Sequence, residues 1–132
     1  MEDSPKQLLQ VVNASKDGKI IAHKVAWAGS SAERRRGLLG RISLNAEEGI
    51  YIAPSEWVHT FGMRFAIDIA FLSSRGQILA VHHRLKPNRF SKFVLRAKGV
   101  LELSEGTLRL TNTEMGDVVQ FVNIATRELI TF

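Results

Sequence analysis

The chain has 132 residues and a formal net charge of +5, with 45% hydrophobic and 23% charged residues. These proportions exclude an intrinsically disordered chain, and the length predicts a single domain over residues 1–132. The absence of cysteine excludes disulfides, thiolate metal sites and a cysteine nucleophile.

The N-terminal segment, MEDSPKQLLQVVN, does not have the pattern of an export signal. Glu2 and Asp3 stand where a signal peptide has its basic region, and the apolar stretch that follows is short. No run in the sequence approaches the roughly 18 apolar residues of a membrane-spanning helix. We therefore expect a basic, cytoplasmic protein with no membrane partner.

Two strands joined by a turn are predicted between Leu8 and about Ala28. LLQVVN and KIIAHKVAWA are rich in β-branched residues, and the second segment alternates between two faces. Between them, SKDG contains the dipeptide Asp-Gly, which readily adopts the positive φ angles of a tight hairpin turn. This predicts a hairpin.

A short helix is predicted near residues 31–40. Ser30 and Glu33 have the spacing of a capping box, in which the two side chains satisfy free backbone N–H groups of the first turn. Gly37 and Gly40 disfavour a longer helix, because each costs about 1 kcal/mol relative to alanine. We expect the helix to cover one end of a sheet and to carry three arginines on its surface: Arg34, Arg35 and Arg36.

The rest of the chain is dominated by strand patterns. IYIA and WVHTF are followed by RFAIDIAFL and QILAVHHRL, which the turn SSRG joins into a hairpin. GVLEL predicts a buried strand, TLRLTNTEMGD is ambiguous between an irregular strand and a short helix, and DVVQFVNIATRELITF predicts two more strands. About eight or nine short strands predict a mainly β fold, a compact antiparallel β-sandwich or a jelly-roll-like barrel.

Asp68 is a carboxylate between Ile67 and Ile69 in a predicted central strand. Burying it without a partner would cost several kcal/mol. Arg64 is on the same side of the strand but about 13 Å away, because an extended chain rises about 3.3 Å per residue. A partner must come from elsewhere, and the arginines at 34–36 or Arg41 are the obvious supply. Asp68 therefore either pins the helix to the sheet or faces a ligand.

The segment around residues 57–68 combines aromatic and charged side chains, as ligand pockets do. We predict a non-enzymatic binding module with a cleft there for a small polar ligand or a peptide. Aromatic groups would supply apolar contacts, and charged groups would fix the orientation of the ligand. The predicted lining consists of Trp57, His59, Met63, Arg64, Asp68, Arg34, Arg41 and Glu102.

A basic stretch from His82 to Lys98 suggests an alternative function, association with nucleic acid. It contains no Asp or Glu, and Phe90 and Phe93 stand among its cations, a composition suited to base stacking and phosphate contact. The competing interpretation is a solvated loop and an edge strand whose lysines discourage edge pairing. The predicted nucleic-acid contacts are Arg84, Lys86, Arg89, Lys92, Arg96 and Lys98.

Catalysis and metal binding have little support in the sequence. There is no Gly-x-Ser-x-Gly, no phosphate-binding glycine loop and no His-Glu-x-x-His. Asp68 and Glu102 suggest a minor alternative, a hydrolase with a pair of carboxylates. His82 and His83 are adjacent, so that in a strand they point to opposite faces and cannot chelate together. We predict no catalytic residue, no metal and no cofactor.

Five motifs in order resemble the DUF192 family, also called UPF0127, over about residues 31–121. They are RRRGLLGR, GIYI, VHTFGMRFAIDIAFL, VLELSEGT and MGDVV, with Leu39, Ile50 and Ala66 departing from the residues usual in the family. The resemblance implies a compact, mostly antiparallel β fold with one short helix and no established activity. The polar positions that match the family pattern are Arg34, Arg41, His59, Thr60, Arg64, Asp68, Glu102 and Asp117.

Overall fold

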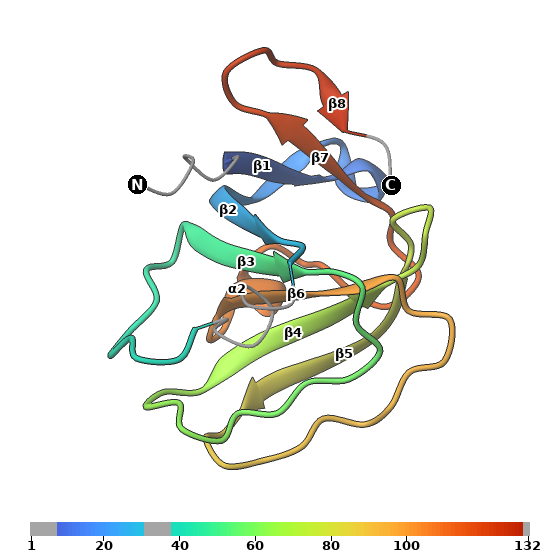
Figure 1. Cartoon of the computed structure of the whole chain (residues 1–132). Helices are drawn as coiled ribbons and strands as arrows, with labels where there is room; N and C mark the ends of the chain where they lie inside the picture. Colours follow the sequence, from blue (N-terminus) through green and yellow to red (C-terminus); the bar gives the residue numbers. More distant parts are fainter. Residues whose placement is uncertain (1–7, 31–37, 131–132) are drawn as a thin grey trace.

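The computed structural model describes residues 8–30 and 38–130. In these ranges eight strands form one sheet in the order β5-β4-β6-β3-β2-β1-β7-β8 (Figure 1). Two short helices accompany them, the 3-10 helix η1 (Ala14–Lys16) and α2 (Thr107–Leu110). The strands are β1 (Leu8–Asn13), β2 (Lys19–Ala28), β3 (Glu48–Ile52), β4 (Ile67–Leu72), β5 (Ile78–Leu85), β6 (Gly99–Ser104), β7 (Val119–Asn123) and β8 (Leu129–Ile130).

The predicted mainly β fold and both predicted hairpins are confirmed. β1 pairs antiparallel with β2, and Asp17 and Gly18 in the turn have φ angles of 57° and 73°. β4 pairs antiparallel with β5 across a turn in which Gly76 has a φ angle of 81°. The sheet is nevertheless mixed, because β2 and β3 are parallel. The long connection between them returns the chain to the start of β2 before β3 begins, as a parallel pair requires.

Backbone contacts join the two sides of the sheet at one end, which favours the barrel over the sandwich. Gln77 and Val118 form an isolated antiparallel bridge. The Ile78 N–H donates to the Asp117 carbonyl at 2.8 Å, and the Val119 N–H donates to the Gly76 carbonyl at 2.9 Å. The beginning of β5 therefore lies beside the beginning of β7, and the sheet curves into a partly closed barrel.

Each face of the sheet buries its own hydrophobic core. The barrel core draws on seven strands and includes Tyr51 and Phe121, whose rings meet edge to face at a centroid distance of 4.8 Å. The outer core lies on the opposite face and includes Ile50, Ile69 and Val100. Segments outside the sheet cover the outer core and contribute to it Leu38, Leu44, Val58, Met63 and Ala97. Strands buried on both faces explain why β4 is hydrophobic at nearly every position.

Three segments outside these hairpins compare differently with their predictions. WVHTF does not form a strand, since its ladder contact is a single bridge between His59 and Phe90. The ambiguous TLRL segment forms α2. The predicted helix near residues 31–40 falls mostly outside the described residues; of its described part, residues 38–40 form a turn, and Leu38 is buried in the outer core.

Gly99 at the start of β6 has no room for a side chain. A Cβ atom there would lie 2.6 Å from Cζ of Tyr51 and 2.7 Å from the carbonyl oxygen of Ile52. We expect Gly99→Ala to lower the free energy of unfolding, measured by urea denaturation, by about 1–3 kcal/mol or more. The matched control is Gly29→Ala, whose added Cβ would lie at an ordinary 3.5 Å from the Trp27 ring. Equal stability of the two variants would contradict this reading of the β3–β6 contact.

Candidate functional site

The residues predicted to line one cleft lie in different environments. Asp68 is directly opposite Leu103 and Ile69 is directly opposite Glu102, so the two carboxyl groups point to opposite faces of the sheet. Met63 is buried in the outer core, the layer that Glu102 faces. Arg34 lies outside the described residues. The remaining predicted residues are exposed: Arg41, Trp57, His59 and Arg64.

Backbone groups satisfy the Asp68 carboxylate. Its Oδ1 accepts a hydrogen bond from the Arg84 N–H at 2.9 Å, and its Oδ2 accepts one from the Leu108 N–H at 3.0 Å. Arg84 has a φ angle of 54° and lies where the pairing of β4 with β5 is irregular. Leu108 is in the first turn of α2, whose N-cap residue is Gly106 and supplies no side-chain cap. Asp68 therefore holds an irregular stretch of β5 and the start of α2 to the central strand.

The predicted ion pair between Asp68 and Arg41 is wrong. Arg41 Nη2 instead lies 3.0 Å from Glu48 Oε1, at the surface. Within residues 8–30 and 38–130 no basic side chain forms an ion pair with Asp68. The two backbone donors offset part of the free-energy cost of burying this carboxylate. The arginines at 34–36, the other predicted source of a partner, lie outside the described residues.

Glu102 differs from Asp68 in having no such partners. Its exposed fraction is 3%, and its neighbours directly across the strands are Ile50 and Ile69. Among the described residues no side chain or backbone group forms a hydrogen bond or ion pair with its carboxyl group. Burial raises the pKa of Glu102 to about 8, so the group is mostly a neutral carboxylic acid at pH 7. It can then both donate and accept a hydrogen bond.

A second feature is a ribbon formed by two loops, residues 56–62 and 86–94. The buried Thr60 joins them: its Oγ1 donates to the Lys86 carbonyl at 2.6 Å and accepts from the Arg89 N–H at 2.9 Å. The Thr60 N–H also donates to the Arg89 carbonyl at 2.8 Å. Ser91 does the same further along, since its Oγ accepts from the Val58 N–H at 2.9 Å and its N–H donates to the Val58 carbonyl. We call this paired structure the two-loop ribbon.

The two-loop ribbon carries four clustered rings, Trp57, His59, Phe61 and Phe90, which we call the aromatic platform. Their neighbouring centroids lie 4.8–6.5 Å apart. The side chains of Trp57, Phe61 and Phe90 are 45%, 42% and 64% exposed. Sequence reasoning identified Trp57 and His59 but placed them in a cleft with Asp68. It missed Phe61 and the pairing of Phe90 with these residues, because that contact depends on how two loops meet.

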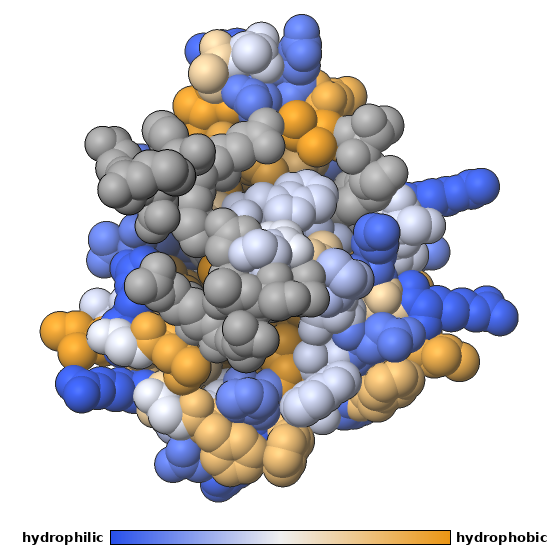
Figure 2. Space-filling view, in the orientation of Figure 1, coloured by the Kyte–Doolittle hydropathy of each residue, from blue (hydrophilic) through white to orange (hydrophobic). Residues whose placement is uncertain are grey.

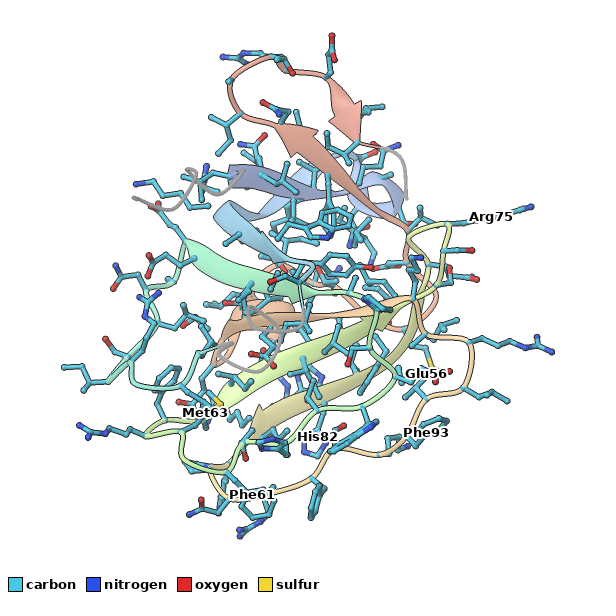
Figure 3. All side chains as sticks on the ribbon, viewed as in Figure 1. Glu56, Phe61, Met63, Arg75, His82 and Phe93 are labelled. Atoms are coloured by element: carbon cyan, nitrogen blue, oxygen red, sulfur yellow. The ribbon has the colours of Figure 1, made fainter. Side chains whose placement is uncertain are left out.

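Three cations of the basic stretch, Lys86, Arg89 and Lys92, belong to the two-loop ribbon that carries this platform. All six predicted nucleic-acid contacts are exposed, from Arg84 to Lys98. Arg84 has a long ion pair, 3.9 Å, with the half-exposed Glu105. In the side-chain view, Phe61, His82 and Phe93 lie along the same lower end of the molecule (Figure 3). Hydrophobic and hydrophilic side chains are interspersed along that end in the space-filling view (Figure 2).

No three His, Cys, Asp or Glu side chains within residues 8–30 and 38–130 are grouped so that they could hold a metal ion. In the same ranges, none of the helices has the length and apolar character needed to cross a membrane.

Comparison with known proteins identifies the family. Residues 12–121 match the model of DUF192, described as an uncharacterized ACR. The chain belongs to the DUF192 family. The match extends the predicted 31–121 region toward the N-terminus, so it includes most of the β1–β2 hairpin. No curated protein significantly matches the chain.

Two solved structures resemble this DUF192 protein. One is a "putative transcription regulator" from Sinorhizobium meliloti 1021, with a TM-score of 0.76 and 21% identity over 91% of this chain and 98% of that one. The other is a protein of unknown function from Novosphingobium aromaticivorans DSM 12444, with a TM-score of 0.77 and 21% identity over 90% of this chain and 89% of that one. At this level of identity the similarity establishes the shared fold.

Proposed function

We propose that this DUF192 protein is a non-enzymatic binding module that holds a small polar ligand through Glu102. The observation that carries the proposal is a buried carboxyl group with no partner among the described residues. A leucine or methionine in place of Glu102 would pack against Ile50 and Ile69 and would leave no buried polar group to satisfy. A carboxyl group whose pKa burial raises strongly is a candidate for function.

The proposed ligand reaches Glu102 from the face of the sheet that carries the outer core. The carboxyl group points from β6 into the outer core, between the sheet and the covering segments that contribute Leu38 and Met63. A ligand would enter between the sheet and these segments. This retains Glu102 and Met63 from the predicted lining and leaves out Asp68, which serves the backbone on the other face.

We propose an amine as the polar group of the ligand. An ammonium beside Glu102 would favour the ionised carboxylate, and the two charges would compensate each other in the apolar layer. Binding would then release a proton at pH values below the pKa of Glu102. A neutral hydroxyl group would exchange hydrogen bonds with the carboxyl group but would bring no opposite charge, so it would leave the carboxyl group protonated.

Binding has more support than hydrolysis. A hydrolase with two carboxylates needs both on one side of the bond it cleaves, within about 5–10 Å of each other. Asp68 and Glu102 point to opposite faces of the sheet, and both oxygens of Asp68 accept backbone hydrogen bonds. The minor hydrolase alternative therefore has no geometry to support it.

Thermal unfolding with a small panel of compounds tests the proposal. We expect at least one of butylamine, 1,4-diaminobutane and lysine to raise the Tm of the wild-type protein, whereas butanol does not. The increase should disappear in Glu102→Gln and remain in Glu105→Gln, which alters a half-exposed carboxylate. An equal increase in Glu102→Gln would show that the amine binds elsewhere. No increase with any amine would refute the proposed ligand class.

A further inference from the structure

We propose that the aromatic platform and the cations beside it bind single-stranded nucleic acid. This site is separate from Glu102 and does not depend on the proposed function. It joins two segments that the sequence presents apart, the aromatic residues near 57–61 and the basic stretch from 82 to 98.

The exposure of the rings is the first observation. Exposed aromatic clusters are unusual on a soluble protein and mark binding surfaces. Phe90 is 64% exposed, and in the same basic stretch Phe93 is 59% exposed. Neither ring belongs to the outer core, whose members include Val58, Met63 and Ala97. Their exposed faces are available for stacking, a contact worth about 1–3 kcal/mol per base.

The rigidity of the surface is the second observation. Thr60 and Ser91, both buried, fasten the two-loop ribbon with hydrogen bonds of 2.6–2.9 Å. The His59 Nδ1 accepts a hydrogen bond from the Phe61 N–H at 3.2 Å, which also orients the imidazole ring. A platform that is ordered before binding loses little entropy when a ligand arrives.

Charge decides the kind of partner. The stretch from residue 82 to 98 has six Lys or Arg and no Asp or Glu, and all six cations are exposed. The two-loop ribbon contains one carboxylate, Glu56, whose Oε2 accepts a hydrogen bond from the Arg96 N–H. Single-stranded nucleic acid combines a chain of phosphates with unpaired flat bases, so it can use the cations and the rings together. Duplex DNA keeps its bases stacked inside, and the Asp and Glu side chains of an acidic peptide carry no ring to stack on the platform.

Fluorescence anisotropy with fluorescein-labelled dT20 tests the proposal on the whole chain. We expect binding whose log Kd rises linearly with log salt concentration, because phosphate contacts release counterions. Unlabelled dT20 should quench the tryptophan fluorescence of the wild-type protein but not that of Trp57→Leu, in which Trp27 is the one remaining tryptophan. Binding that does not respond to salt would overturn the proposal.

Variants separate the contributions of charge and stacking. We expect the double variant Arg89→Glu, Lys92→Glu to weaken dT20 binding at least tenfold, while Lys19→Glu and Lys24→Glu together, with the same charge change on β2, have little effect. Phe90→Leu keeps apolar area but loses the flat face, and it should weaken binding about fivefold or more. Circular dichroism checks that each variant folds. Equal affinity of the wild type and Phe90→Leu would contradict stacking.

Competing polyanions decide between partners. The protein should bind labelled dT20 at least tenfold more tightly than it binds a 20-bp duplex or poly-glutamate of similar charge. Phosphatidylglycerol vesicles, which present a membrane surface, should displace labelled dT20 at least tenfold less effectively than unlabelled dT20 does. Poly-glutamate or vesicles competing as well as unlabelled dT20 would overturn the proposal and indicate an acidic peptide or a lipid surface. Equal binding of the duplex would also overturn it, because phosphate contact would then suffice without the rings.

Discussion

Replacing Glu102 with glutamine is expected to stabilise the protein at alkaline pH and to change its stability little in acid. The pKa of Glu102 is about 8 in the folded protein and about 4.5 for an unperturbed glutamate. Between these values the folded chain keeps a proton that the unfolded chain has released. Folding stability therefore falls as pH rises through this window, by up to about 1.4 kcal/mol per pH unit.

The physical reason is the apolar surroundings of the carboxyl group. Below pH 4.5 it is neutral in both states, so its ionisation contributes nothing to the pH dependence of stability. Above pH 8 the folded state holds an ionised carboxylate beside Ile50 and Ile69, and the accumulated loss reaches several kcal/mol. Glutamine has nearly the same shape and does not ionise, so this loss should be absent from the variant.

Urea denaturation from pH 5 to pH 9 provides the measurement. The quantity of interest is the difference in unfolding free energy between Glu102→Gln and the wild type, because other titrating groups largely cancel in it. We expect this difference to increase with pH in favour of the variant and to level off above about pH 8. The control, Glu105→Gln, should show no such trend. A difference that does not vary with pH would mean that Glu102 is not held as a neutral acid.

Replacing Asp68 with alanine is expected to destabilise the protein by about 2–5 kcal/mol. The substitution removes the acceptor of both the Arg84 N–H and the Leu108 N–H, and each unsatisfied buried donor costs about 1–3 kcal/mol. Leu108 is fully buried in the barrel core, so its N–H cannot turn to water without moving the side chain. The start of α2 should therefore loosen together with the irregular part of β5.

Unfolding experiments on two variants separate the loss of acceptors from the loss of volume. Asp68→Asn has nearly the wild-type volume but a single carbonyl acceptor, so it should also be destabilised, by at least about 1 kcal/mol. Glu47→Ala removes an exposed carboxylate and should be nearly neutral. Hydrogen exchange at Leu108 should accelerate in both Asp68 variants. Wild-type stability of Asp68→Asn would show that one acceptor is enough.

The sequence determined most of the local structure. Asp-Gly at residues 17–18 and SSRG at 73–76 act through backbone preferences of a few neighbouring residues, so both hairpins were predicted from them. Alternating and continuous hydrophobic runs likewise identified the central strands. The same reasoning assigned a strand to WVHTF, because its hydrophobic spacing does not reveal whether a neighbouring strand is there to pair with it.

Tertiary structure decided the sites. Alternation showed that Asp68 and Glu102 each interrupt a hydrophobic strand, but the register of β4 against β6 decided that they point to opposite faces. The sequence equally required a partner for Asp68, and only the fold supplied it, as two backbone N–H groups from segments 16 and 40 residues away. The aromatic platform arises in the same way, since His59 and Phe90 are neighbours through a contact between loops. Such long-range contacts depend on how all the strands pack, which no short stretch of sequence encodes.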